Sequence, residues 1–275
     1  MKKFLLTVLV LLLATAGFIF WLFQRDADGV PILTYHRVSD TDDNPATLKV
    51  ADFDAQMKFL IDDGYHVISP DDLLDAWEAD KTLPAKPVIL TFDDGHADIY
   101  RNVFPILQKY NTRATVFIAT DKIGMKDYLT WDEVRALQNG GFVDFESRTM
   151  TGDDLTKLRG DKLWNEIYGS KQAIEWALKK PAKFIAYPGG KYTVEAEDTS
   201  KEVHFRAGFI EDYGLAKKDD DNYILTRIPV VGSNSQTLLR FKLRLKGSPI
   251  LAPINRFKND IAEGNPEIAD LIFIP

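Results

Sequence analysis

Two adjacent carboxylates follow a short apolar run in the first third of the chain. The run covers residues 88–92 and leads directly into Asp93, Asp94 and Gly95. A short, continuous apolar run is typical of a strand buried on both faces, as in a parallel sheet. The C-terminal ends of parallel strands are where α/β folds place their chemistry. This position favours a functional role for the two aspartates.

Neighbouring carboxylates at a strand end repel each other unless a cation or a shared proton relieves the repulsion. Such a pair therefore indicates a metal site or an acid–base site. The other interpretation is an acidic turn at the start of the next helix, because Asp and Gly both favour turns. On the residues alone, both interpretations stay open.

The elements that position this pair alternate along the chain. Strand-like apolar runs are predicted at 31–36, 66–68, 88–92, 114–119, 142–145, 183–187, near 209 and at 228–231. Helices are predicted at 51–63, 70–77, 99–110, 131–139, 153–158, 162–179, 199–206 and 236–245. Repeated strand-then-helix order predicts an α/β fold with a parallel sheet. Some seven such units fit a (β/α) barrel, distorted or incompletely closed.

Composition narrows the classes of function. The chain has 275 residues, of which 45% are hydrophobic, and this composition suits one globular domain. We predict this domain at residues 26–245. The tail at 246–275 shows no clear pattern and stays unassigned. The net charge of −7 argues against a nucleic-acid partner. There is no cysteine, which excludes disulfides, thiolate metal sites and a lipid-modified cysteine anchor. The oligomeric state is left open.

The first 25 residues predict a membrane anchor or signal segment. Lys2 and Lys3 precede an apolar run over residues 4–23, and about 20 apolar residues suffice for a helix to cross a bilayer. We expect an uncleaved single-pass helix in the cell membrane, with the main domain extracytoplasmic. The alternative is a secreted protein, cleaved after the small residues at 14–16.

Several motifs in order resemble the polysaccharide deacetylase (NodB-homology) family. The segment 91–95, Thr-Phe-Asp-Asp-Gly, resembles its first motif, and segments 32–38, 102–107, 114–117, 186–190 and 225–230 resemble others. The resemblance implies a NodB-type barrel and a metal-dependent hydrolase that removes N-acetyl groups from amino-sugar polysaccharide by cleaving a carbon–nitrogen bond. It implies Asp93 as general base and Asp94 as a ligand of a zinc-like divalent metal.

The second motif departs from the family pattern. The family places two metal-binding histidines there, and the corresponding positions within 141–152 carry Arg148 and Gly152. A guanidinium stays protonated and glycine has no side chain, so neither can bind the metal. The third motif resembles the family at Tyr187, Pro188 and Gly189, and we predict that these residues line a cleft with Ser147 and Arg148. The family's late histidine acid is not found.

Two histidines are candidates for a relocated metal site. His36 lies at the C-terminal end of the first predicted strand, and His96 lies two residues after Asp94. Together with Asp144 or Glu146 they could provide substitute ligands. The structural interpretation is a packed strand-end side chain for His36 and a helix-entry residue for His96.

Three functions follow from these observations. The first is an envelope protein of this family, with impaired or lost metal-dependent catalysis, that binds an amino-sugar polysaccharide, peptidoglycan or a partner. The second is an active N-deacetylase with an unorthodox metal set, and the third is a surface scaffold. We also expect Arg148 to form an ion pair with Asp93 or Asp94 in place of the metal, because a guanidinium can pair with carboxylates in bidentate fashion.

Overall fold

The computed structural model describes residues 28–230, apart from 43, 45 and 46, together with 232, 238–264 and a few isolated positions. Most of the predicted anchor at 4–23 and most of the last eleven residues lie outside the described residues. Among the helices that are described, none is both long and apolar enough to cross a bilayer.

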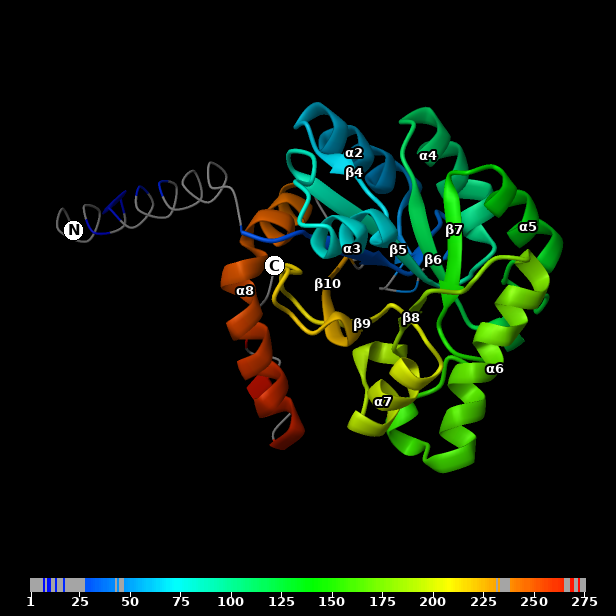
Figure 1. Cartoon of the computed structure of the whole chain (residues 1–275). Coiled ribbons are helices and arrows are strands. Elements are labelled where there is room, and N and C mark those ends of the chain that lie inside the picture. Colours follow the sequence, from blue (N-terminus) through cyan, green and yellow to red (C-terminus); the bar gives the residue numbers. More distant parts are fainter. Residues whose placement is uncertain are drawn as a thin grey trace.

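A ring of parallel strands forms the centre of the described structure (Figure 1). In spatial order it contains β1 (Ile32–Tyr35), β10 (Leu225–Pro229), β9 (Ala207–Glu211), β8 (Phe184–Ala186), β7 (Val143–Ser147), β6 (Ala114–Ile118) and β5 (Pro87–Asp94). The pairing of β1 with both β5 and β10 closes the ring. A short strand, β4 (His66–Val67), adds to the other edge of β5, and β2 (Arg37–Val38) pairs with β3 (Thr47–Leu48). The predicted (β/α) barrel is confirmed, and in the described residues it is closed.

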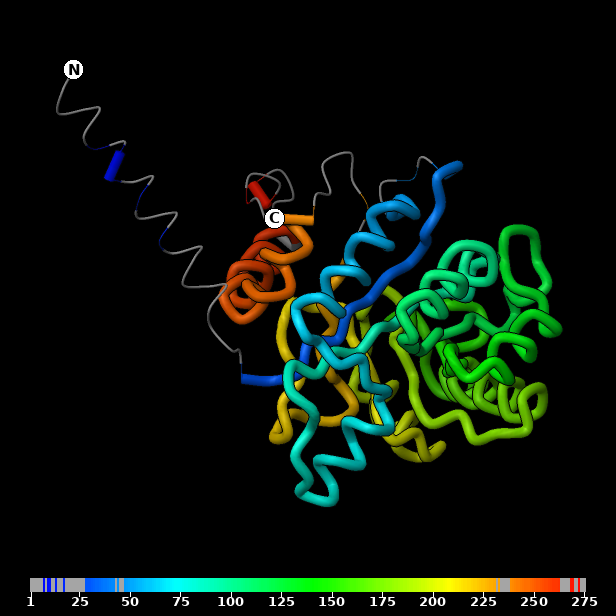
Figure 2. The backbone as a smooth tube through the Cα atoms, turned by 90° about the horizontal axis from the view of Figure 1, so that it is seen from above, coloured from blue at the N-terminus to red at the C-terminus, as the bar shows by residue number. Residues whose placement is uncertain are grey.

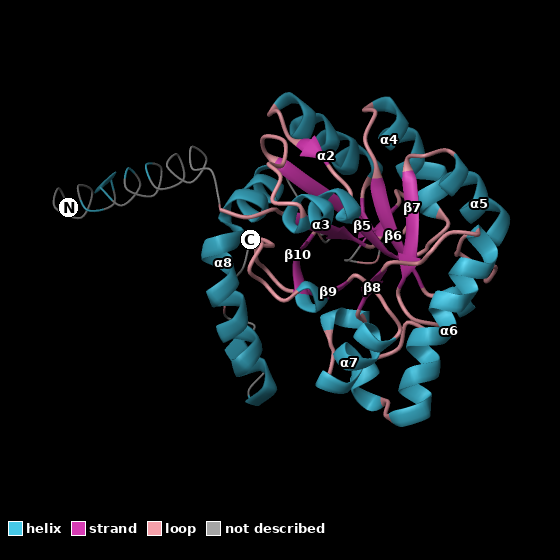
Figure 3. Ribbon diagram, viewed as in Figure 1, coloured by secondary structure: helices cyan, strands magenta, loops and turns pink. Residues whose placement is uncertain are grey.

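Helices wrap the outside of this ring (Figure 3). They are α2 (Val50–Asp62), α3 (Pro70–Glu78), α4 (Phe104–Lys109), α5 (Trp131–Asn139), α6 (Gly160–Leu178), α7 (Val194–Glu202) and α8 (Leu238–Gly264). A π-helical turn, η1 (Ile99–Val103), precedes α4, and short 3₁₀ turns occupy η2 (Thr120–Lys122), η3 (Leu155–Lys157), η4 (Pro188–Gly190) and η5 (Asn222–Ile224). The hydroxyls of Ser69 and Thr130 cap α3 and α5 in reciprocal capping boxes.

Three predicted helices differ from the structure. The helix predicted at 153–158 is only the single turn η3, and the one predicted at 199–206 begins earlier, at Val194, because Thr193 caps it. The helix predicted at 236–245 continues as α8 through Pro249 and Pro253 to Gly264. Packing of Phe241 and Leu245 against the body of the protein holds α8 in place despite the two prolines.

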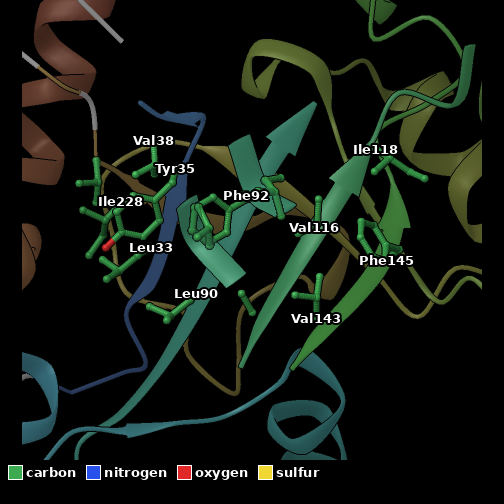
Figure 4. Close-up of a cluster of buried hydrophobic side chains, with 14 of the residues drawn as sticks. Leu33, Tyr35, Val38, Leu90, Phe92, Val116, Ile118, Val143, Phe145 and Ile228 are labelled. Atoms are coloured by element: carbon green, nitrogen blue, oxygen red, sulfur yellow. The ribbon is translucent and has the colours of Figure 1, made fainter. Parts of the chain in front are cut away.

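Two hydrophobic layers follow from the alternation of side chains along each strand. Leu33, Phe92 and Phe145 face outward and pack beneath the helices, as Figure 4 shows for part of this layer. The inward-facing layer includes Ile32 and Phe117. Along the inner face of β5 the residues change from Ile89 to Thr91 to Asp93, so the barrel interior becomes polar towards the C-terminal ends of its strands.

The seam between β7 and β8 depends on a buried carboxylate. These strands share only the register pair Ser147 and Ile185. The Oε2 atom of Glu146 accepts hydrogen bonds from the backbone N–H groups of Lys183 (2.7 Å) and Phe184 (2.9 Å), and its Oε1 atom pairs with Lys180 (2.7 Å). Burial raises the pKa of Glu146 to about 8, although Lys180 acts in the opposite direction. The Glu146 carboxylate therefore supplies acceptors that a strand ladder would otherwise provide.

We predict that Glu146→Ala lowers the free energy of unfolding by about 2–4 kcal/mol, because two buried N–H groups lose their acceptor. Asp144→Ala is the matched control, since Asp144 pairs with the same Lys180 at 2.8 Å but is more exposed; its cost should stay below about 1 kcal/mol. Denaturant unfolding of both variants measures the difference. Equal costs would contradict the role of Glu146 as a backbone acceptor.

Candidate functional site at the barrel mouth

The end of β5 brings both aspartates to one place by a backbone turn. Successive strand residues face opposite sides, so adjacent side chains can share a site only where the strand bends. Asp94 has a φ of +73°, in the left-handed region, which Asp tolerates better than most residues. Asp93 is fully buried inside the barrel, whereas the Asp94 side chain is 24% exposed at the mouth.

Arg148 joins the two carboxylates. It follows β7, is buried, and places Nη1 at 2.5 Å from Oδ2 of Asp93 and Nε at 2.8 Å from Oδ1 of Asp94. The predicted ion pair is confirmed, and it involves both aspartates instead of one. Burial acts against ionisation of Asp94, but the nearby His36 and Arg148 hold the pKa of that carboxyl well below its usual range.

Arg227 of β10 is a second buried partner of Asp93. Its Nη1 and Nη2 atoms donate to Oδ1 and Oδ2 of Asp93 at 2.7 and 2.9 Å, and both side chains are fully buried. The guanidinium lies 5.3 Å from the ring centre of Phe117, which forms part of the inner core. Sequence reasoning assigned residues 225–230 to a strand and did not identify Arg227. The available signal was a charged residue within an otherwise apolar buried strand.

His36 and Glu211 complete the cluster. The Nδ1 atom of His36 lies 3.6 Å from Oδ2 of Asp94, and its Nε2 atom lies 3.7 Å from Oε1 of Glu211. Burial works against protonation of His36, but Asp94, Glu211 and Asp93 outweigh it and raise its pKa to about 10. Glu211 is the last residue of β9 and was not predicted. In the sequence, nothing distinguishes a buried glutamate at the end of a strand from a solvent-exposed one.

His96 lies at the edge of the cluster. Its Nε2 atom is 3.9 Å from Oδ2 of Asp94, and its ring stacks on Tyr128 with 4.7 Å between ring centres. Burial lowers the pKa of His96, and the charge of Asp94 only partly compensates.

Charges balance within the cluster. Three carboxylates, Asp93, Asp94 and Glu211, are matched by three cationic side chains, those of Arg148, Arg227 and His36. The pairing relieves the repulsion between the adjacent aspartates, so no further positive charge is needed to stabilise them.

Other residues of the predicted cleft turn away from the mouth. The hydroxyl of Ser147 shares a hydrogen bond of 2.6 Å with Ser170 of α6, on the outer side of β7. Tyr187 is buried and stacks on Tyr192 with 5.5 Å between ring centres, and Pro188 is buried as well. The predicted cleft is therefore wrong for Ser147 and Tyr187, because the residue next to an inward-facing position on a strand faces the helices.

The turn that carries Gly189 still borders the cluster. Gly189 itself is exposed with a φ of +61°, and a Cβ atom on the next residue, Gly190, would lie 2.5 Å from the backbone nitrogen of Glu211. Asp144 and Glu146, considered as substitute ligands, both pair with Lys180 instead.

A cationic side chain, that of Lys122, also lies beside Gly152, the second histidine position of the family pattern. Gly152 has a φ of +73°, and a Cβ atom there would lie 3.2 Å from Lys122 Nζ and 3.2 Å from Ala119 Cβ. A larger residue at this position would be strained and would have to displace the lysine.

These residues do not fit a divalent metal. One ligand atom each from His36, Asp93 and Glu211 lies within 4.8 Å of the others, which is the spacing of a ligand set. However, both oxygens of Asp93 are held by guanidinium groups, and His36 carries a proton at neutral pH. A divalent cation would enter a cluster that already contains three cationic groups, so electrostatic repulsion opposes its binding.

We predict that Arg148→Ala lowers the free energy of unfolding by about 1–3 kcal/mol, because Asp93 and Asp94 each lose a buried partner. Arg159→Ala is the control, since the Arg159 side chain is 61% exposed and lies 3.7 Å from Glu195; its effect should stay within about 0.5 kcal/mol. Thermal and denaturant unfolding give both values. An Arg148→Ala protein that unfolds like the wild type would show that the pair does not stabilise the fold.

We also predict a pH dependence from His36. Its pKa is raised from 6.5 to about 10, so its stabilising contribution is complete below pH 6.5 and is lost as the pH rises towards 10. The unfolding free energy of the wild type should fall over this range more steeply than that of His36→Gln. NMR titration of the imidazole checks the cause directly, and a midpoint near 6.5 would refute it.

Comparison with known proteins agrees with this architecture. A family model described as "Polysaccharide deacetylase" matches residues 80–208. YxkH of Bacillus subtilis, classed among the polysaccharide deacetylases, is 30% identical over 210 residues, covering 76% of this chain and 74% of that protein. A poly-β-1,6-N-acetyl-D-glucosamine N-deacetylase of Staphylococcus aureus is 29% identical over 155 residues, about half the length of each chain.

Solved structures show the same fold. A deacetylase of Streptococcus pyogenes, PplD, solved with acetate, superposes with a TM-score of 0.71 at 26% identity, covering 75% of this chain and 94% of that one. BC0361, a polysaccharide deacetylase from Bacillus cereus, gives a TM-score of 0.70 at 26% identity, covering 79% and 69%. With the barrel, the paired aspartates and a relative matched over three quarters of its length, the chain belongs to the polysaccharide deacetylase family.

Proposed function

We propose that this chain is a membrane-anchored envelope protein that binds an N-acetylated amino-sugar polymer and does not catalyse metal-dependent deacetylation. The observation that carries the proposal is the position of Asp93. Its carboxylate is fully buried and is held by Arg148 on one side and by Arg227 in bidentate fashion on the other.

A general base must reach the proton that it removes, directly or through one water molecule. Both Asp93 oxygens already accept from guanidinium groups, and the side chain is 0% exposed. These constraints argue against the role that the family resemblance gives to Asp93.

The mouth still offers polar groups to a sugar. The side chains of His36, Asp94 and Glu211 are between 19% and 24% exposed, and they present an imidazole N–H and carboxylate oxygens. Such groups bind hydroxyl and acetamido groups by charge-assisted hydrogen bonds. The name of the Staphylococcus aureus relative, a poly-β-1,6-N-acetyl-D-glucosamine N-deacetylase, supports an amino-sugar polymer as the ligand class.

One observation favours a second function, an active N-deacetylase with an unusual metal set. The ligand atoms of His36, Asp93 and Glu211 are close enough to surround one cation. For this function Arg148 and Arg227 would have to release Asp93, and His36 would have to lose its proton.

We predict that the purified full chain holds zinc, nickel and cobalt well below stoichiometric amounts by elemental analysis. It should release no acetate from N-acetylglucosamine oligomers, yet bind them in titration calorimetry. Arg148→His combined with Gly152→His should not gain stoichiometric zinc, because residue 152 has a left-handed backbone beside Lys122.

Glu211→Gln separates the two functions. If the protein only binds sugar, this substitution weakens binding and leaves the metal content low. Near-stoichiometric zinc together with acetate release, both lost in Glu211→Gln, would overturn the proposal in favour of the hydrolase.

A further inference from the structure

The second half of α8 carries an apolar stripe. Ile250, Ile254, Phe257 and Ile261 follow each other at intervals of four, three and four residues, which places them along one side of a helix. Ile254 is 40% exposed and Phe257 is 60% exposed. Large apolar side chains at such exposure, arranged in a line, are typical of an interaction surface.

Contacts of α8 with the barrel fix the direction of this stripe. Phe241, Leu245 and Ala252 are buried against the body of the protein. Farther along, Asn255 donates to Asp212 at 2.9 Å and Arg256 donates to it at 3.2 Å, just beyond the end of β9. These bonds hold the helix in one orientation, so within the described residues the exposed part of the stripe faces solvent.

A pocket of about 630 Å³ adjoins the stripe. Its walls include Ile210, Leu215 and Ile224 on the barrel side and Pro249 and Ile250 on α8. Ile250 therefore belongs both to the stripe and to the groove between α8 and the barrel, whose lining also carries charged residues such as Asp212, Lys217 and Asp220.

The chain enters the described structure at the same place. Asp28 lines this pocket and lies 3.5 Å from Lys217, and Val30 pairs with Ala216 in an isolated bridge. Figure 2, in which the described chain begins in blue, shows this start beside α8. The described part of the chain therefore begins at the groove that borders the stripe.

The length of the preceding linker limits where the apolar run can lie. Only residues 24–27 separate the uncharged run at 4–23 from Asp28. Four extended residues span roughly 14 Å at about 3.5 Å each. A run that crosses the bilayer would therefore hold the groove and α8 close to the membrane surface.

We infer that the stripe Ile250, Ile254, Phe257 and Ile261 docks on the lipid bilayer, with α8 lying along its surface. The inference rests on the membrane anchoring in the proposed function. Amphipathic surface helices bury their apolar face roughly 5–10 Å into the boundary between headgroups and acyl chains, and aromatic residues such as Phe257 are common there. The barrel is thus held by two membrane contacts, which restricts its rotation about the anchor.

Single-cysteine labelling of the full chain tests this inference, because the sequence contains no cysteine. Phe257→Cys carries an environment-sensitive fluorophore in vesicles of phosphatidylethanolamine and phosphatidylglycerol. Trp176→Cys is the matched control, since Trp176 is 75% exposed and lies on α6, across the barrel from α8 (Figure 1). Leu13→Cys reports on the apolar run itself.

The label at 257 should emit at shorter wavelength than the label at 176, be quenched several-fold less by aqueous iodide, and be quenched by brominated lipids. A label at 13 that is buried in lipid while the label at 257 behaves like that at 176 would overturn the docking and leave the anchor intact. Labels at 13 and 257 that are both exposed to iodide would overturn the anchor and, with it, the docking. Protection of 257 from iodide without quenching by brominated lipids would show that protein, not lipid, covers the stripe.

Discussion

The structure of the barrel mouth depends on the neutralisation of Asp93. A carboxylate that is fully removed from water is strongly destabilising unless it is paired and hydrogen-bonded. Here two guanidinium groups surround it, one from the loop after β7 and one from β10, on different parts of the ring. The ion pairs therefore connect strands that do not neighbour each other. They help to hold the barrel closed, and the closed barrel in turn brings the arginines to Asp93.

Much of this arrangement follows from patterns in the sequence. Alternating apolar runs and helices predicted the barrel, because strands that are buried on both faces occur mainly in parallel sheets covered by helices. The resemblance at residues 91–95 and 141–152 brought Asp93, Asp94 and Arg148 together, since consecutive parallel strands end at one face. Local motifs were sufficient to predict contacts between side chains on strands that follow each other along the chain, such as β5 and β7 with β6 between them.

The remaining contacts depend on how the ring closes. Arg227 meets Asp93 because β1 pairs with both β5 and β10, and no local pattern encodes that closure. Ser147 and Tyr187 face the helices because inward and outward positions alternate along a strand. A strand assignment that is wrong by one residue therefore places every side chain on the wrong face. The extent of α8 was missed because tertiary packing of Phe241 overrides the local effect of prolines.

The left-handed backbone at Gly152 has a consequence for the evolution of this site. Exchange of Arg148 alone removes one cationic partner from both Asp93 and Asp94, and a side chain at residue 152 alone meets Lys122 and strains the chain. Any route of single substitutions towards a metal-binding mouth therefore passes through less stable proteins. Marginal stability makes such intermediates subject to removal by selection. A metal-binding mouth could therefore arise from the present ion-pair cluster only through several coordinated substitutions.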